Sequence, residues 1–141
     1  MPRQIRLAEP AICDVSQLRR REPVWTALSE LWLDTEIAEQ DLARIAHVMA
    51  ESGFDIATLR AIYLVEVAPV VSWNLLGVAG VWTTFDPQWL HSAIVHNLRY
   101  RARYLRFLAR FPLTRRLMTY ATEEHWTKLV EFIAKRRATT A

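Results

Sequence analysis

The sequence predicts an all-α protein, a single compact helical domain of about five or six helices over residues 1–141. Apolar residues recur three and four positions apart along most of the chain, which is the spacing of helices that bury one face. Only three glycines and six prolines occur, and they fall where helices should begin or end. A chain of 141 residues can bury one sizeable core. We expect residues 1–13 to be loosely ordered.

Cap and breaker residues divide the first half of the chain into four helices. Asp14 and Asp55 can each cap a helix, Pro23 suits a first helical position, and Gly53 can stop a helix. The predicted helices are Val15–Arg21, a helix from Pro23 that ends near Asp34–Thr35, a helix over Glu39–Ser52, and a helix after Asp55 that Pro69 bends or ends.

The second half begins with an apolar segment, Val70–Phe85, that shows no alternation typical of a strand and can hold another helical turn or two. Asp86 and Pro87 then form a strong helix start. The remaining predicted elements are a long helix that runs to Arg110 and is broken by Phe111-Pro112, a short turn around Thr114–Tyr120, and a final helix over Glu123–Arg136 capped by Thr122.

One stretch, Ala61–Trp82, is apolar enough to resemble a membrane span. Glu66 and Pro69 interrupt it, and a charge in mid-span is costly. We therefore expect a buried central helix and no membrane contact, with the following residues mostly buried: Ile62, Leu64, Val67, Leu75 and Leu76.

Charge is sorted along the chain. From Glu22 to Glu66 nine acidic side chains accompany two basic ones, a formal charge of −7. From Pro87 to Ala141 eleven basic side chains accompany three acidic ones, a formal charge of +8. Such an asymmetric field can steer a charged partner, or it can hold the two halves of the chain together.

Two candidate contact regions follow from this pattern. The first is acidic, with a tryptophan beside it, and comprises Trp32, Asp34, Glu36, Glu39 and Asp41. The same acids could instead be a structural connector, which we favour for Ala27–Glu36, whereas a metal site is least favoured because the spacing of a calcium loop is absent. We expect no metal there.

The second candidate region is basic and comprises Arg99, Arg103, Arg106 and Arg110, which share a helix face. Tyr100, Tyr104, Phe107 and Phe111 also recur at helical spacing, and we expect this stripe to lie in the core. Arginines interleaved with aromatic rings are also typical of nucleic-acid surfaces, which is the second interpretation because the acidic half would repel nucleic acid.

Catalytic signatures are absent from the sequence, so the chain is expected not to be an enzyme and to need no cofactor. His91 and His96 are five residues apart and do not share a helix face, as a two-histidine metal motif requires. Cys13 is the only cysteine. An enzyme that uses the carboxylates of Asp34, Glu36 and Asp41 is the weakest class. Since Met1–Pro10 shows no signal-peptide pattern, we expect a cytoplasmic protein.

Two strings, ALSELWLDTE at Ala27–Glu36 and NLLGVAGVWTTFDPQWL at Asn74–Leu90, resemble a small bacterial family of unknown function. The resemblance covers roughly Pro23–Leu98. It implies a cytoplasmic helical protein with no assigned activity and supplies no catalytic residue. The chain beyond Arg99 lies outside the resemblance, so the basic half is expected to be particular to this protein.

Together these features favour a non-enzymatic protein-binding protein. The narrower hypothesis is an immunity-type inhibitor that neutralises a bacterial toxin by covering its active surface. It rests on small size, separated charge, six tryptophans and the absence of catalytic groups. Complementary charge raises the rate of association, which an inhibitor needs. The alternative is a nucleic-acid-associated regulator that uses the arginine-rich helix.

Overall fold

Helices make up most of the part of the chain that the structure describes, which confirms the all-α prediction. The computed structural model describes residues 15–33, 37–77, 86–120 and 122–140, and no strand occurs among them. In chain order the elements are α1 (Val15–Ser29), the 3₁₀ turn η1 (Glu30–Trp32), α2 (Glu39–Glu51), α3 (Ile56–Ala61), the π-helical η2 (Ile62–Val67), α4 (Ala68–Gly77), α5 (Pro87–Tyr100), α6 (Ala102–Arg110), α7 (Pro112–Thr119) and α8 (Glu123–Thr140).

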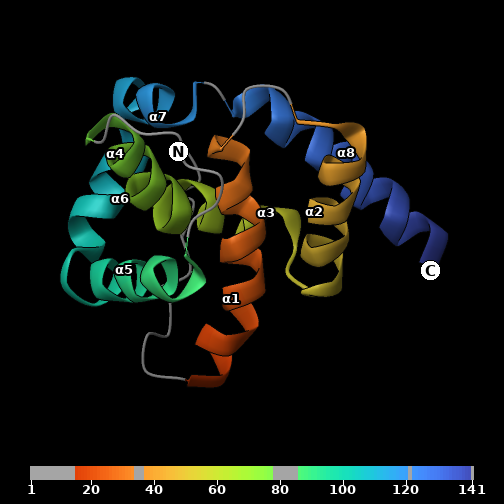
Figure 1. The fold of residues 1–141 in the computed structure, drawn as a ribbon, viewed down its shortest axis with the longest axis horizontal. Coiled ribbons are helices and arrows are strands. Elements are labelled where there is room, and N and C mark those ends of the chain that lie inside the picture. The colour runs from red at the N-terminus through yellow and green to blue at the C-terminus, as the bar shows by residue number, and fades with distance from the viewer. Residues whose placement is uncertain (1–14, 34–36, 78–85, 121, 141) are drawn as a thin grey trace, which may run out of the picture.

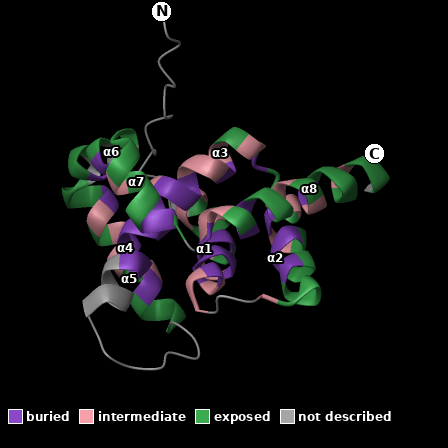
Figure 2. Cartoon of the chain, turned by 90° about the horizontal axis from the view of Figure 1, so that it is seen from above, coloured by how far each residue is buried: buried purple, intermediate pink, exposed green. Residues whose placement is uncertain are grey.

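The helices are arranged on two sides of α1. In Figure 1 α2 and α8 lie on one side of α1, and α4 to α7 lie on the other, an arrangement that Figure 2 repeats from above. The main core cluster draws buried residues from both sides, among them Trp25 of α1, Ile45 of α2, Ile94 of α5 and Ile133 of α8. The predicted core positions Ile62, Leu64 and Val67 are buried, and Leu75 and Leu76 lie outside the residues whose side chains are described.

Several predicted helix ends are confirmed by their hydrogen bonds. The Asp55 carboxylate accepts a bond from the Thr58 backbone N–H at 2.7 Å, and Asp86 accepts from the Gln88 N–H at 3.4 Å, with Pro87 in the first turn of α5. Gly53 follows α2 with φ of 76°, a left-handed conformation that glycine adopts without strain. Cap chemistry therefore located these boundaries correctly.

Proline positions were less well predicted. Pro23 lies inside α1, so the two helices expected before Asp34 are one. Pro23 and Arg19 are both exposed, so water can bond the Arg19 carbonyl that the proline leaves without a donor. Pro69 does not end its helix either, because α3, η2 and α4 run on continuously from Ile56 to Gly77. The wide π-helical turns of η2 end immediately before Pro69, where the regular backbone ladder would otherwise be broken.

Two other elements differ from the predictions. The helix expected from Pro87 to Arg110 breaks at Arg101, which has φ of −126° and ψ of 19°. No proline or glycine causes this break. Both parts pack on η2, but their other neighbours differ, since α5 also packs on α1 and α6 also packs on α7. The turn expected at Thr114–Tyr120 is the helix α7, and the described residues form seven continuous helices rather than five or six.

A buried carboxylate joins α1 to the continuous helix formed by α3, η2 and α4, which we call the central helix. Glu66, which is 5% exposed, lies in η2, the π-helical part of that helix. Its two oxygens accept bonds from different side chains of α1, one from Arg21 Nη1 at 2.6 Å and one from Trp25 Nε1 at 2.9 Å. A buried charge is tolerated only with such partners, so this contact fixes where α1 lies against η2.

Aromatic side chains attach the later helices to the same central helix. The rings of Tyr63 and Trp126 stack with centroids 4.8 Å apart, and the Tyr63 hydroxyl bonds the hydroxyl of Thr122. Thr122 was expected to cap α8, and its carbonyl does accept from the Trp126 N–H at 2.9 Å, but its hydroxyl is used by Tyr63 and by the Thr119 carbonyl. These contacts hold the start of α8 against η2.

The ion pair between Arg21 and Glu66 should be strongly coupled. Arg21→Met or Glu66→Leu alone should lower the free energy of unfolding by about 3–5 kcal/mol, because each leaves the other charge buried without its oppositely charged partner. The double variant should lose less than the sum of the two. Urea unfolding measures all three. Glu30→Ala, which breaks the exposed pair with Arg44, is the control and should cost no more than about 1 kcal/mol.

Glu66 should also make stability depend on pH. Burial raises the pKa of the Glu66 carboxyl, against the opposing effects of Arg21 and the Trp25 N–H. The folded protein then binds the Glu66 proton more tightly than the unfolded chain does, so the resulting stability is complete below the ordinary pKa of glutamate, about 4.3, and is lost as pH rises through the raised pKa. The unfolding free energy of the wild type, taken relative to Glu66→Gln, should therefore fall with increasing pH. Denaturant titrations of both proteins at a series of pH values above the ordinary pKa of glutamate measure this difference. A difference that rises with pH would contradict a raised pKa of Glu66.

Candidate functional site

Large apolar side chains are exposed on one part of the molecule. Among the described residues, all the large hydrophobic side chains that are clearly exposed lie between positions 89 and 120: Trp89, Tyr100, Tyr104, Phe107, Phe111, Leu113, Leu117 and Tyr120. Tyr100 is 69% exposed and Phe107 is 55% exposed. Exposure of this many large apolar side chains on neighbouring helices is typical of a site that another molecule covers.

This exposure corrects the prediction that the aromatic stripe of residues 100–111 lies in the core. The buried residues of α5 and α6 are instead Leu98, Leu105 and Leu108. Two apolar stripes run along these helices, one of leucines and one of aromatic rings, and both have helical spacing. Periodicity alone cannot decide which stripe is buried. The smaller leucines pack against the central helix, and the rings face outward.

Arginines accompany the exposed rings. From Pro87 to Thr122 the chain has seven arginines and no acidic residue. Arg99, Arg103 and Arg110 are exposed, and none forms an ion pair with a described residue, whereas the side chain of Arg106 lies outside the described part. We define the aromatic-arginine surface as the exposed side chains of α5 to α7 that combine these features: Arg99, Tyr100, Arg103, Tyr104, Phe107, Arg110, Phe111, Leu113 and Leu117.

A pocket opens beside this surface where α4, α5 and α6 meet. It has a volume of about 420 Å³ and is lined by Pro69, Val70, Ala93, Asn97, Arg101, Tyr104, Leu105 and Leu108. Tyr104 belongs both to the pocket and to the aromatic-arginine surface. The lining of this pocket is mostly apolar, with Asn97 and Arg101 as its polar members. Such a pocket is suited to one inserted side chain of a partner.

The acidic candidate region lies elsewhere. Glu39 and Asp41 are exposed in the first turn of α2, and Asp41 lies 3.7 Å from Arg44. Asp34 and Glu36 are outside the described residues. Figure 1 shows α2 on the side of α1 away from α5 and α6. Of the described residues of this region, Glu39 and Asp41 therefore lie away from the arginines of α5 and α6, whereas Trp32 packs against Leu108 and Met118.

Trp32, the aromatic residue of the acidic region, is part of the internal packing. Its Nε1 donates to the Met118 carbonyl of α7 at 3.0 Å, and its ring lies 5.4 Å from the ring of Tyr63. The indole N–H that could anchor a partner is already used within the fold. Trp32 thus holds η1 to α7, a role that its sequence position did not reveal.

Other kinds of site find little support in the residues described. No group of three or more His, Cys, Asp or Glu side chains is gathered there as a metal would require. None of the described helices combines the length and apolar character needed to cross a membrane. The polar contact between Thr26 and His91, with Oγ1 and Nε2 2.8 Å apart, joins α1 to α5 and does not border the pocket between α4, α5 and α6.

Comparison with known proteins gives a family without an activity. A family model described as Domain of unknown function (DUF7079) matches residues 19–132. The match extends through α6 and α7, so the chain from Arg99 to Phe132 lies within the family's domain, beyond the range that the shorter resemblance covered. Neither a curated protein nor a solved structure matches the chain.

The two stripes of α6 should respond differently to truncation. Leu105 is 2% exposed, so Leu105→Ala should lower the free energy of unfolding by about 2–5 kcal/mol. Phe107→Ala removes a larger side chain that is half exposed, and it should cost less than about 1 kcal/mol. Thermal and urea unfolding of both variants test the assignment, and a larger loss for Phe107→Ala would return the aromatic stripe to the core.

Proposed function

The chain belongs to this family of unknown function, and we propose from its exposed surface that it is a non-enzymatic protein-binding protein. More narrowly, we propose an immunity-type inhibitor that covers the active surface of a bacterial toxin in the cytoplasm. The observation that carries the proposal is the aromatic-arginine surface. Protein interfaces are enriched in aromatic residues and arginine at their centres, which is the composition found here.

The surface also specifies what the partner should look like. Since no acid lies between Pro87 and Thr122, the field over α5 to α7 is positive, and the partner should present acidic groups around an apolar patch. A toxin whose active surface presents exposed carboxylates fits that description. Arginines at the rim would raise the association rate, and rings such as Phe107 and Phe111 would slow dissociation.

Nucleic acid is the second candidate, and one observation favours it more than the sequence did. The acidic helix α2 lies on the far side of α1, so it does not face a ligand on α5 and α6. Rings between arginines can stack on bases. Against this, Leu113 and Leu117 are also exposed on α7, and leucines do not stack on bases. The apolar content therefore favours a protein.

A parallel capture experiment tests the proposal. The wild type, Arg99→Glu/Arg103→Glu/Arg110→Glu and Phe107→Ser/Phe111→Ser serve as bait in lysate of the source organism, with Glu39→Lys/Asp41→Lys as the matched control on the opposite side. One protein should be captured by the wild type and the control and lost with both surface variants. Expressed alone, that protein should stop growth, and co-expression of the wild type should restore it. Capture lost only with the acid reversals would place the contact on α2.

A gel-shift series with generic DNA and RNA at low and high salt separates the two candidates. Nucleic-acid binding should weaken steeply with salt because counterions are released from the phosphates. The protein-binding proposal expects no shift at low salt. A tight, salt-sensitive shift that the arginine reversals abolish, with no protein captured, would replace it with the regulator hypothesis.

A further inference from the structure

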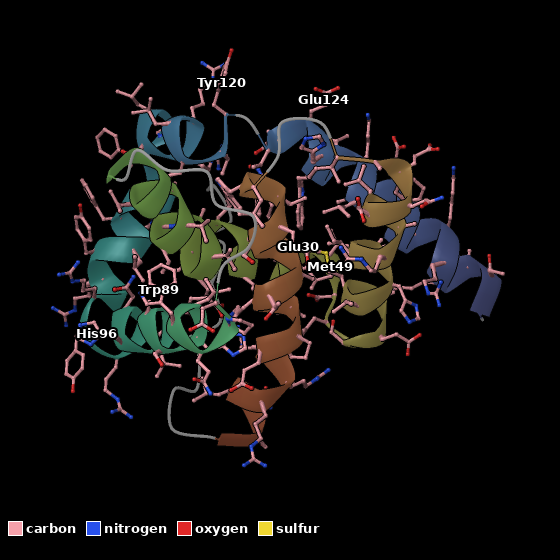
Figure 3. All side chains as sticks on the ribbon, in the orientation of Figure 1. Glu30, Met49, Trp89, His96, Tyr120 and Glu124 are labelled. Atoms are coloured by element: carbon pink, nitrogen blue, oxygen red, sulfur yellow. The ribbon has the colours of Figure 1, made fainter. Side chains whose placement is uncertain are left out.

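A second pocket lies beside the C-terminal half of α7, where that helix meets α3 and α8. Its volume is about 280 Å³, and it is lined by Arg60, Arg115, Arg116, Thr119, Tyr120 and Glu123. Figure 3 shows Tyr120 and Glu124 at the same edge of the molecule, with Tyr120 projecting from the end of α7. This pocket shares no residue with the aromatic-arginine surface or with the pocket between α4 and α6.

The charges around this pocket are not balanced. Three guanidinium groups, those of Arg60, Arg115 and Arg116, accompany one carboxylate, that of Glu123. Glu123 is already bonded to Arg60, with Oε1 2.6 Å from Nη2. Arg115 and Arg116 form no ion pair with any described residue. The pocket therefore has an excess of positive charge that the fold does not neutralise.

Arg60 supplies a second and independent indication of a missing partner. Its Nη1 is buried and has no hydrogen-bond partner among the described residues. The guanidinium is held in place over the rings of Tyr63 and Trp126, each with its centroid 5.3 Å away. A buried donor without an acceptor costs about 1–3 kcal/mol, and more when the group is charged. A ligand that offers acceptor oxygens would remove that cost once the Arg60 side chain turns this nitrogen into the pocket, because Nη1 is closed to water in this structure.

We propose that this pocket binds a phosphate group. Guanidinium forks match the oxygens of phosphate and form strong charge-assisted bonds with them. Arg115 and Arg116 lie on successive positions of α7 and Arg60 on α3, so three cations from two elements line one pocket, and the exposed phenol of Tyr120 can donate at its rim. The volume is several times the 30 Å³ or so that a water occupies in the liquid, which leaves room for such a group. The proposal does not depend on the protein-binding function.

Calorimetric titration with inorganic phosphate and with phenyl phosphate, against chloride at matched ionic strength, tests this site. The wild type should show one saturable site. Arg115→Gln/Arg116→Gln should weaken it by at least about tenfold, because charge-assisted hydrogen bonds are lost. Arg99→Gln/Arg103→Gln removes the same charge elsewhere and should leave the affinity unchanged within about twofold, since distant exposed charges are screened. Tighter binding of phenyl phosphate than of phosphate would identify the source as a phosphate ester, and the reverse would identify free phosphate.

Arg60→Lys is the second variant, because it keeps a cation beside Glu123 but removes the unpartnered nitrogen. It should also weaken phosphate binding, while circular dichroism shows the helical spectrum of the wild type. The absence of a saturable site in the wild type would overturn the proposal. So would equal weakening by the pocket variant and by Arg99→Gln/Arg103→Gln, which would show a general effect of charge. Acetate that binds as tightly as phosphate would overturn the assignment to phosphate.

Discussion

The fold depends on how one carboxylate is accommodated inside the central helix. Glu66 lies in the π-helical stretch η2, where it receives Arg21 and Trp25 from α1. A lone charge in so apolar a segment would be costly, so α1 must lie where both donors reach it. Tyr63 on the same stretch bonds the hydroxyl of Thr122 and stacks on the ring of Trp126, and these contacts place the start of α8. The π-helical geometry thus positions two helices from one segment of the chain and also precedes Pro69, where a regular helix would be strained.

Once α1 and the central helix are fixed, the leucines of α5 and α6 complete the core. Leu98, Leu105 and Leu108 fill the space beside the central helix, so the aromatic stripe on the same two helices has no interior to enter. Burying apolar area contributes roughly 25 cal/mol per Å², and the exposed rings forgo that contribution within this chain. An exposed stripe of four aromatic residues is more readily explained by a partner than by the stability of the isolated chain.

Local signals in the sequence were sufficient for much of the fold and for little of the site. The caps at Asp55 and Asp86 and the stop at Gly53 depend on neighbouring residues, and these predictions were correct. The break at Arg101, the passage of the helix through Pro69 and the burial of leucines rather than rings depend on distant packing, which periodicity does not report. For the same reason the bond from Trp32 to α7 was not predicted, and Arg60 was not singled out. A lone Glu66 within an apolar run was the one available signal that a buried basic partner had to exist.

The ion pairs of the fold leave the charge of the arginine-rich segment unneutralised. Among the described residues the close ion pairs Arg21–Glu66, Arg44–Glu30 and Arg60–Glu123 each join different elements. None of them uses an arginine between positions 99 and 116. The described acids of the first half that form ion pairs therefore do so with bases outside the arginine-rich segment, and the field of that segment is left for other molecules. Such a field speeds association, but salt screens it. The adjacent rings supply an apolar contact that salt does not screen. A surface with both properties is suited to capturing an acidic partner quickly and holding it.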